Sequence, residues 1–173
     1  MRKNLNDLQS TFFAFFARIF GGKAPRVGLE IGDHTVRILY EKRGSWQLEQ
    51  IPLPPGTVTR GVIGNQPVLL KALIELRKRA SSNNKRVGVH VSLSSAPIYT
   101  QVVQVPRVSR EELPAAVELN VQVSAPVPLT ELAWGWQVLR PRDEGVDVLA
   151  AWISEQTMDR LVTILTQAGF LAA

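Results

Sequence analysis

The sequence predicts an α+β fold, with its elements in the order βββ α β followed by β α β β α. Three observations support this class. Several runs of strand length are rich in Val and Ile, and within them apolar residues either alternate with polar ones or follow one another. Segments with an apolar residue at every third or fourth position lie between these runs, as amphipathic helices require. The chain has 173 residues, 45% of them hydrophobic, which is enough to bury one core or two small ones.

Residues 1–25 differ from the rest in composition, because five of the six phenylalanines lie there. They predict an amphipathic helix, too short to span a bilayer, which takes roughly 20 apolar residues. Gly21 and Gly22 end it. One interpretation places it on an anionic membrane surface; the other docks it on its own domain or on a partner helix. The residues expected to make the contact are Phe12, Phe13, Phe15, Phe16, Ile19 and Phe20.

Three strand-type runs come next, at residues 27–31, 35–41 and 46–51. They form a meander, with turns at Gly32-Asp33 and Gly44-Ser45. A helix follows the rigid segment LPPGTV (residues 53–58), which cannot continue a strand interior. Asn65 is its N-cap and Pro67 lies near its first position. The basic residues 77–79 fall in its last turn, where they favour the negative end of the helix dipole.

The second half predicts strands at residues 86–93 and 98–106, then a helix. Ser109 and Glu112 form a capping-box pattern at the start of this helix, and Pro114 predicts a kink or a late start. We expect this helix to carry four apolar residues: Leu113, Val117, Leu119 and Val121.

The last elements are a hairpin and a helix. The hairpin strands are expected at residues 132–139 and 146–153. Ser154 is expected to cap the final helix, and Gly169 to end it.

Composition argues against several classes of protein. The chain has no cysteine, which excludes disulfides and thiolate metal sites and is typical of a reducing compartment. Its net charge of +5 is spread along the chain without a dense basic stripe, so no nucleic-acid partner is predicted. His34 and His90 have no second ligand at metal spacing, so no metal site is predicted, and no catalytic residue stands out.

Four stretches, taken in order, resemble the PilM family of type IV pilus assembly, which is related to the division protein FtsA and to actin-like ATPases. They are VGLEIGDHTVRIL, LPPGTVTRGVI, QVVQVPRVSREEL and APVPLTELAWGWQVL. The resemblance extends from about Arg26 to the last residue, and its specificity lies in the ordered set. It implies that the chain corresponds to the N-terminal half of such a protein.

The resemblance also implies a division of the chain. Residues 26–95 would be the first part of an actin-like (RNase H-like) subdomain 1A. Residues 96–173 would be an inserted strand-helix-strand-strand-helix (SHS2-like) subdomain 1C and the following helix. In this family the other half of the protein, expected outside this chain, completes the nucleotide-binding site.

In actin-like ATPases the tip of the first hairpin cradles the nucleotide phosphates, because backbone N–H groups at a glycine-containing turn bind anions. The matching residues here are Glu30, Gly32, Asp33, His34, Thr35 and Arg37. Glu30 would place the metal, although it is longer than aspartate, and Asp33 would repel an anion. A plain polar turn is the favoured alternative. No cofactor is firmly implied. ATP with Mg²⁺ is implied only if the other half of the family's protein is also present.

The function implied is a cytoplasmic adaptor at the inner face of the bacterial inner membrane. It would serve a type IV or related mannose-sensitive (MSHA) pilus by binding the N-terminal cytoplasmic peptide of a PilN-like bitopic partner. The alternative is an actin-like ATPase, or a type II secretion or cell-division scaffold. Exposed sheet edges would also favour a homo-oligomer. The groove for the peptide would lie near Pro52, Leu53, Val103, Val105, Pro126 and Pro128.

Overall fold

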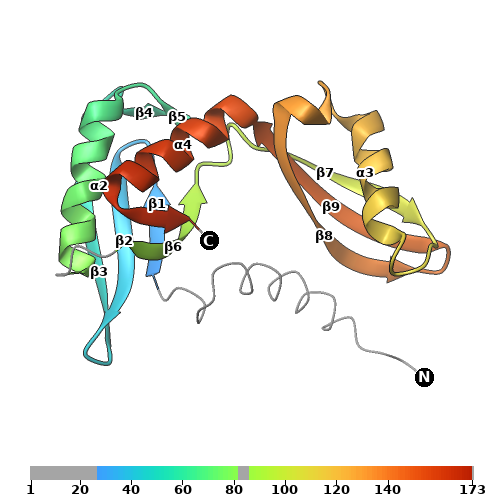
Figure 1. Ribbon diagram of the computed structural model, residues 1–173, viewed down its shortest axis with the longest axis horizontal. Coiled ribbons are helices and arrows are strands. Elements are labelled where there is room, and N and C mark those ends of the chain that lie inside the picture. The colour runs from blue at the N-terminus through green and yellow to red at the C-terminus, as the bar shows by residue number, and fades with distance from the viewer. Residues whose placement is uncertain (1–26, 82–85, 173) are drawn as a thin grey trace.

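The computed structural model describes residues 27–81 and 86–172, which form two lobes (Figure 1). A five-stranded sheet in the order β10-β6-β1-β2-β3 organises the first lobe. Its strands are β1 (Val27–Ile31), β2 (Thr35–Lys42), β3 (Ser45–Pro52), β6 (Val87–Leu93) and β10 (Phe170–Ala172). The meander β1-β2-β3 is antiparallel as predicted, whereas β6 runs parallel to β1 and β10 runs parallel to β6.

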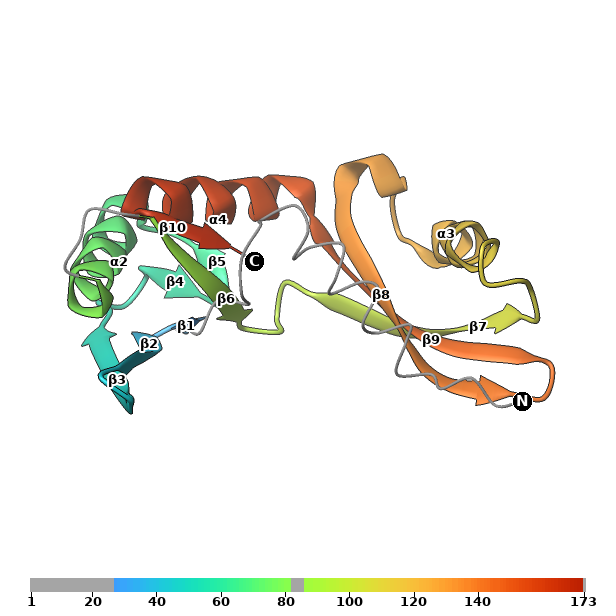
Figure 2. The ribbon, with the colours of Figure 1, turned by 60° about the horizontal axis from the view of Figure 1, so that its bottom comes forward.

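Two helices cover one face of this sheet, α2 (Gln66–Ala80) and α4 (Glu155–Ala168), as Figure 2 shows. Alternate residues of the strands point toward them, which is the period-2 pattern of a sheet with one buried face. Leu29, Ile38, Leu73, Ile164 and Phe170 are each at most 1% exposed in the core between sheet and helices. Burial of this face holds the first lobe together.

The ends of the two helices follow the predicted signals with one exception. The Asn65 side chain accepts a hydrogen bond from the Val68 amide at 3.3 Å, and a proline occupies the first turn of α2. Gly169 has a φ of 88° and ends α4, while the Ser154 side chain makes no capping hydrogen bond. Ser154 therefore occupies the predicted N-cap position of α4, but its side chain does not supply the capping hydrogen bond.

A small hairpin, β4 (Val58–Thr59) and β5 (Val62–Ile63), lies between β3 and α2. The sequence alone did not predict this hairpin. Its two turn residues, Arg60 and Gly61, both have positive φ, 51° and 76°, which is the conformation of a type I′ turn.

The second lobe is a three-stranded antiparallel sheet in the order β7-β9-β8, packed against α3. Its elements are β7 (Tyr99–Pro106), α3 (Leu113–Ser124), the short 3-10 helix η1 (Leu129–Glu131), β8 (Leu132–Arg142) and β9 (Gly145–Ser154). The core consists of one face of the sheet and the inner side of α3, and includes Val117, Val148 and Ala150.

The start of α3 is as predicted, and only part of its apolar surface is buried. Ser109 and Glu112 form the reciprocal capping box, with hydrogen bonds of 3.0 and 3.3 Å. The helix proper begins at Leu113, so Pro114 lies in its first turn and the late start is confirmed. Of the four apolar residues expected on this helix, Leu113, Val117 and Val121 are buried, whereas Leu119 is 65% exposed.

The chain passes between the lobes twice, between β6 and β7 and from β9 into α4. The second lobe shows the predicted order strand, helix, strand, strand, and α4 follows β9 directly. Helix α4 and strand β10, which the sequence analysis grouped with residues 96–173, pack with the core of the first lobe. The α+β class is confirmed.

Candidate functional site at the junction of the lobes

The tip of the β1–β2 hairpin is closed by its own backbone. The Gly32 amide donates to the Thr35 carbonyl at 2.9 Å. A Cβ at Gly32 would lie 3.3 Å from that same oxygen, so the glycine permits a close turn. The N–H group that a phosphate would use is therefore already hydrogen-bonded within the turn.

Asp33 connects this tip to the β4–β5 turn. Its carboxylate accepts hydrogen bonds from the Arg60 amide at 2.7 Å and from the Gly61 amide at 3.1 Å. The Arg60 N–H, and next the Gly61 N–H, hold the pKa of the Asp33 carboxyl below its ordinary value. Asp33 itself is thus the anion that these two amides bind.

Glu30 and Arg37 form an ion pair on the face of the sheet that α2 and α4 leave uncovered. The two residues are partners on β1 and β2, and their side chains approach to 3.1 Å with about half of each exposed. The acid that would place a metal is therefore paired with a guanidinium. Glu30, Gly32 and Asp33, as they are arranged here, do not fit a bound nucleotide and its Mg²⁺.

Two groups of predicted residues do meet at the hairpin tip. Thr35 pairs with Pro52 across β2 and β3, and the Leu53 amide donates to the His34 carbonyl at 2.7 Å. Pro52 is exposed and Leu53 is buried in the first core. The hairpin tip and the segment after β3 therefore form one structural unit.

This unit lies against the connection to the second lobe. A Cβ at Gly61 would approach Pro97 Cδ to 2.7 Å and Ser94 Cβ to 3.2 Å, so the β4–β5 turn touches the β6–β7 connection. That connection is itself turned, since the Ile98 amide donates to the Ser95 carbonyl at 3.0 Å. The tips of two hairpins and the interlobe connection thus meet in one place, which we call the junction.

The second lobe presents a row of aromatic residues at the end of its sheet nearest the junction. Tyr99 pairs with Trp152, and Trp152 pairs with Trp134, so the three lie in register across β7, β9 and β8. We call these three residues the aromatic row. Tyr99 is 63% exposed and Trp152 is 5% exposed. The buried Trp152 Nε1 meets no hydrogen-bond acceptor among the described residues.

The other predicted groove residues are not gathered in one surface. Val103 and Val105 are 7% and 2% exposed and belong to the core under α3. Pro126 and Pro128 are exposed in the segment between α3 and η1. The phenylalanine-rich segment, with Phe12, Phe13, Phe15, Phe16, Ile19 and Phe20, lies outside the described residues.

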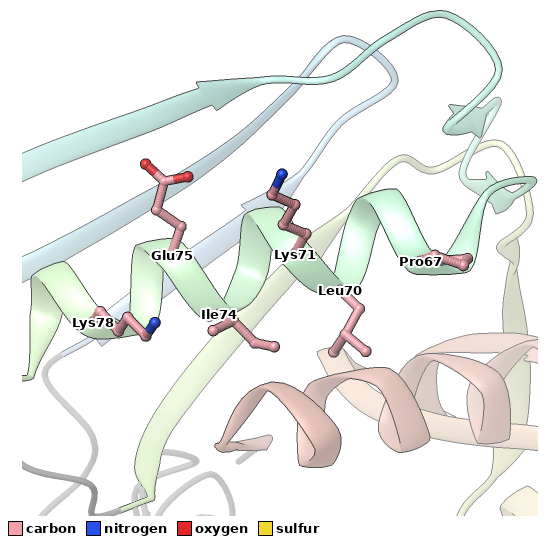
Figure 3. A pocket seen from close by; sticks show the side chains of 6 residues that line it. All are labelled: Pro67, Leu70, Lys71, Ile74, Glu75 and Lys78. Atoms are coloured by element: carbon pink, nitrogen blue, oxygen red, sulfur yellow. The ribbon is translucent and has the colours of Figure 1, made fainter.

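A separate hollow of about 410 Å³ lies along α2 (Figure 3). All six lining residues come from this one helix: Pro67, Leu70, Lys71, Ile74, Glu75 and Lys78. Leu70 and Ile74 point toward α4, and Lys71 and Glu75 point away from it. The hollow contains no residue of the junction.

The described residues offer neither a metal-ion site nor a membrane-spanning helix. Within residues 27–81 and 86–172, no three His, Asp or Glu side chains gather as they would around a metal ion. None of the helices in the same ranges has the length and hydropathy needed to cross a bilayer.

Comparison with known proteins gives a family and two related folds. Residues 28–173 match the family described as type IV pilus assembly protein PilM. The chain is similar to a solved structure described as the PilM-PilN type IV pilus biogenesis complex. The TM-score is 0.73 and the identity 24%, over 88% of this chain and 47% of that one. A search of curated proteins gives no match.

The second solved structure is the cytoplasmic domain of EpsL, an inner membrane component of the type II secretion system of Vibrio cholerae. Its TM-score is 0.54 and its identity 14%, over 85% of this chain and 54% of that one. The chain therefore spans about half the length of each solved relative. At these identities the likeness concerns the fold, and it agrees with the predicted α+β class.

Proposed function

The chain belongs to the PilM family of type IV pilus assembly proteins, and on this premise we propose that it binds the N-terminal cytoplasmic peptide of a PilN-like membrane protein at the junction of its lobes. The related solved structure is of a PilM-PilN complex, which supports a partner of this kind. The proposed place of action is the cytoplasmic face of the inner membrane. The likeness to the cytoplasmic domain of an inner membrane component supports this location.

The observation that carries the proposal is the aromatic row beside the junction. Tyr and Trp side chains supply much of the binding energy in protein interfaces, because they bury a large area with few rotatable bonds. Tyr99 is 63% exposed and starts β7 two residues after Pro97, which touches the β4–β5 turn. A peptide seated there would contact both lobes at once.

A second feature supports an extended peptide. Strand β7 is an edge strand of its sheet, so one row of its backbone N–H and C=O groups faces away from β9. An added strand pairs with such an edge through main-chain hydrogen bonds, while pockets beside it select side chains. Strand addition at β7 would place peptide side chains next to Tyr99.

We further propose that each lobe forms one wall of the peptide site. One wall comes from residues 26–95, together with α4 and β10 that pack with them, and the other wall comes from β7 to β9 of the inserted part. The proposal gives the hairpin tip a structural role in holding the junction and assigns no nucleotide chemistry to it. The hydrogen bonds of Gly32 and Asp33 support that choice.

A binding titration tests the proposal. A fluorescein-labelled synthetic peptide with the N-terminal cytoplasmic sequence of the PilN from the same organism is titrated with the chain, and anisotropy is recorded. Tyr99→Ala is expected to weaken binding at least about tenfold, as truncation of an interface hot spot does. Val123→Ala is the matched control, since Val123 is 83% exposed on α3 of the same lobe. Equal effects of the two variants, or no binding by the unchanged chain, would contradict the proposal.

A further inference from the structure

The face of the first sheet opposite α2 and α4 carries exposed apolar side chains. Gly28 on β1 pairs with Leu39 on β2, and Leu39 pairs with Leu48 on β3, so the three lie in one row. Trp46 lies two positions along β3 and therefore on the same face. Leu39, Leu48 and Trp46 are 43%, 66% and 59% exposed. We call these four residues the open face.

Gly28 leaves the open face without a side chain at this position of β1. Glycine weakens the interior of a strand, and it often marks a place where another group approaches closely. A Cβ at Gly28 would meet only Leu39 Cβ, at 3.9 Å, which is an ordinary contact. The described neighbours of Gly28 thus do not require a glycine. A bulky side chain that packs over β1 would.

We propose that the phenylalanine-rich segment of the same chain, residues 12–20, docks on the open face. The chain enters the first sheet at Val27, directly beside this face, because Gly28 is the second residue of β1. Residues 21–26 join the segment to β1, and six residues span at most about 20 Å. Strands β2 and β3 lie about 5 and 10 Å from β1, so the whole open face is within reach.

The chemistry of the segment matches the surface. The predicted helix gathers Phe12, Phe15, Phe16 and Ile19 on one side, with Arg18 on the other. A helix is about 10 Å across, which is about the width from β1 to β3. Its aromatic side would cover Leu39 and Leu48, and one ring would pack over Gly28.

The short connection also selects the occupant. A tether of a few residues gives an effective concentration in the millimolar range. The segment of the same chain therefore occupies the open face ahead of a second copy at micromolar concentration. The inference is independent of the proposed peptide site, because the open face and the aromatic row lie in different lobes.

Disulfide trapping tests the inference, and the chain suits it because it has no cysteine of its own. The full chain carrying Phe16→Cys and Leu48→Cys is oxidised with diamide, and the products are separated by non-reducing electrophoresis. A disulfide needs the two Cα atoms within about 7 Å. Phe16→Cys with Val123→Cys is the control pair, because Val123 is exposed on the other lobe. The open-face pair is expected to close within one chain at least tenfold faster than the control.

A second pair, Phe15→Cys with Leu39→Cys, guards against a single unfavourable geometry. Each pair is also tested with vesicles of phosphatidylglycerol. Trapping by either open-face pair that persists with vesicles supports the inference. Rates equal to the control for both pairs would overturn it. Disulfides formed only between chains would overturn it in favour of a second copy. Loss of trapping when vesicles co-sediment the chain would overturn it in favour of a membrane surface.

Discussion

At the scale of the residue, Asp33 has the most informative environment in the chain. Seen as part of a phosphate loop, its carboxylate is a defect, because it would repel an anion. In the structure it fills the place of an anion, with the Arg60 and Gly61 amides as donors. The same two positions have positive φ, and hydrogen bonds to their N–H groups stabilise that turn. One side chain thereby secures two hairpins to each other.

Asp33→Asn is expected to lower the thermal unfolding temperature at neutral pH, because the charge-assisted hydrogen bonds weaken. The folded pKa of Asp33 is depressed, so its contribution is present above the unfolded value of about 3.9 and is lost as pH falls through the folded value. The gap between the unchanged chain and Asp33→Asn should therefore close on acidification. Asp143→Asn, in the exposed β8–β9 turn, is the control. A gap that stayed constant down to acid pH would refute this role for Asp33.

The hairpin tip also predicts the response to nucleotide. Because Gly32 and Asp33 already use the local N–H groups, millimolar Mg-ATP is expected to leave the unfolding temperature of this chain unchanged. A ligand that binds the folded state raises that temperature in proportion to the logarithm of its concentration. A saturable rise that Gly32→Val removes would show that the tip binds nucleotide after all.

At the scale of the element, the contact between the β4–β5 turn and the β6–β7 connection holds the junction. Gly61→Ala is expected to destabilise the chain more than Gly56→Ala, as measured by urea unfolding. Both glycines have a φ near +80°, but a Cβ at Gly56 meets nothing within 4 Å, whereas one at Gly61 would strike Pro97. The clash should add about 1–3 kcal/mol to the conformational strain that the two variants share. Equal losses of unfolding free energy for the two variants would contradict a tight contact between Gly61 and Pro97.

Helix α3 is apolar on more than one side, but only one side is buried in the core of the second lobe. Val117→Ala is expected to cost about 2 kcal/mol of unfolding free energy, because Val117 is fully buried. Leu119→Ala should stay within about 0.5 kcal/mol, as surface substitutions usually do. Chemical denaturation of the two variants measures both values. The opposite order would contradict the burial of Val117 and the exposure of Leu119.

At the scale of the whole molecule, the order of the elements could be predicted because each has a local signal. Asn65 and Pro67 start α2, Pro114 delays α3, and Gly169 ends α4. The β4–β5 hairpin could not be predicted, since two-residue strands show no periodicity and Arg60 is not a residue that favours positive φ. The buried side of α3 could not be predicted, because the helix is apolar on more than one side: Val117 is buried and Leu119 is exposed.

The candidate site was predictable only in part. Sequence analysis selected the hairpin tip, but the partners of Asp33 lie 27 and 28 positions away, and only the folded chain brings them together. Val103 and Val105 lie in a segment whose composition predicts a strand. A strand prediction does not reveal whether their side chains face a groove or a core. The aromatic row depends on the register of three strands, which the sequence alone does not reveal.

The measurement that tests the central claim most directly is the mapping of amide chemical shifts in a ¹⁵N-labelled chain titrated with the PilN peptide. At 19.2 kDa the chain suits this method. The account predicts that the shifts gather at residues 33–35, 60–61 and 94–99, which line the junction, and extend along β7. Shifts confined to the hollow on α2 or to the exposed side of α3, with the junction silent, would contradict it.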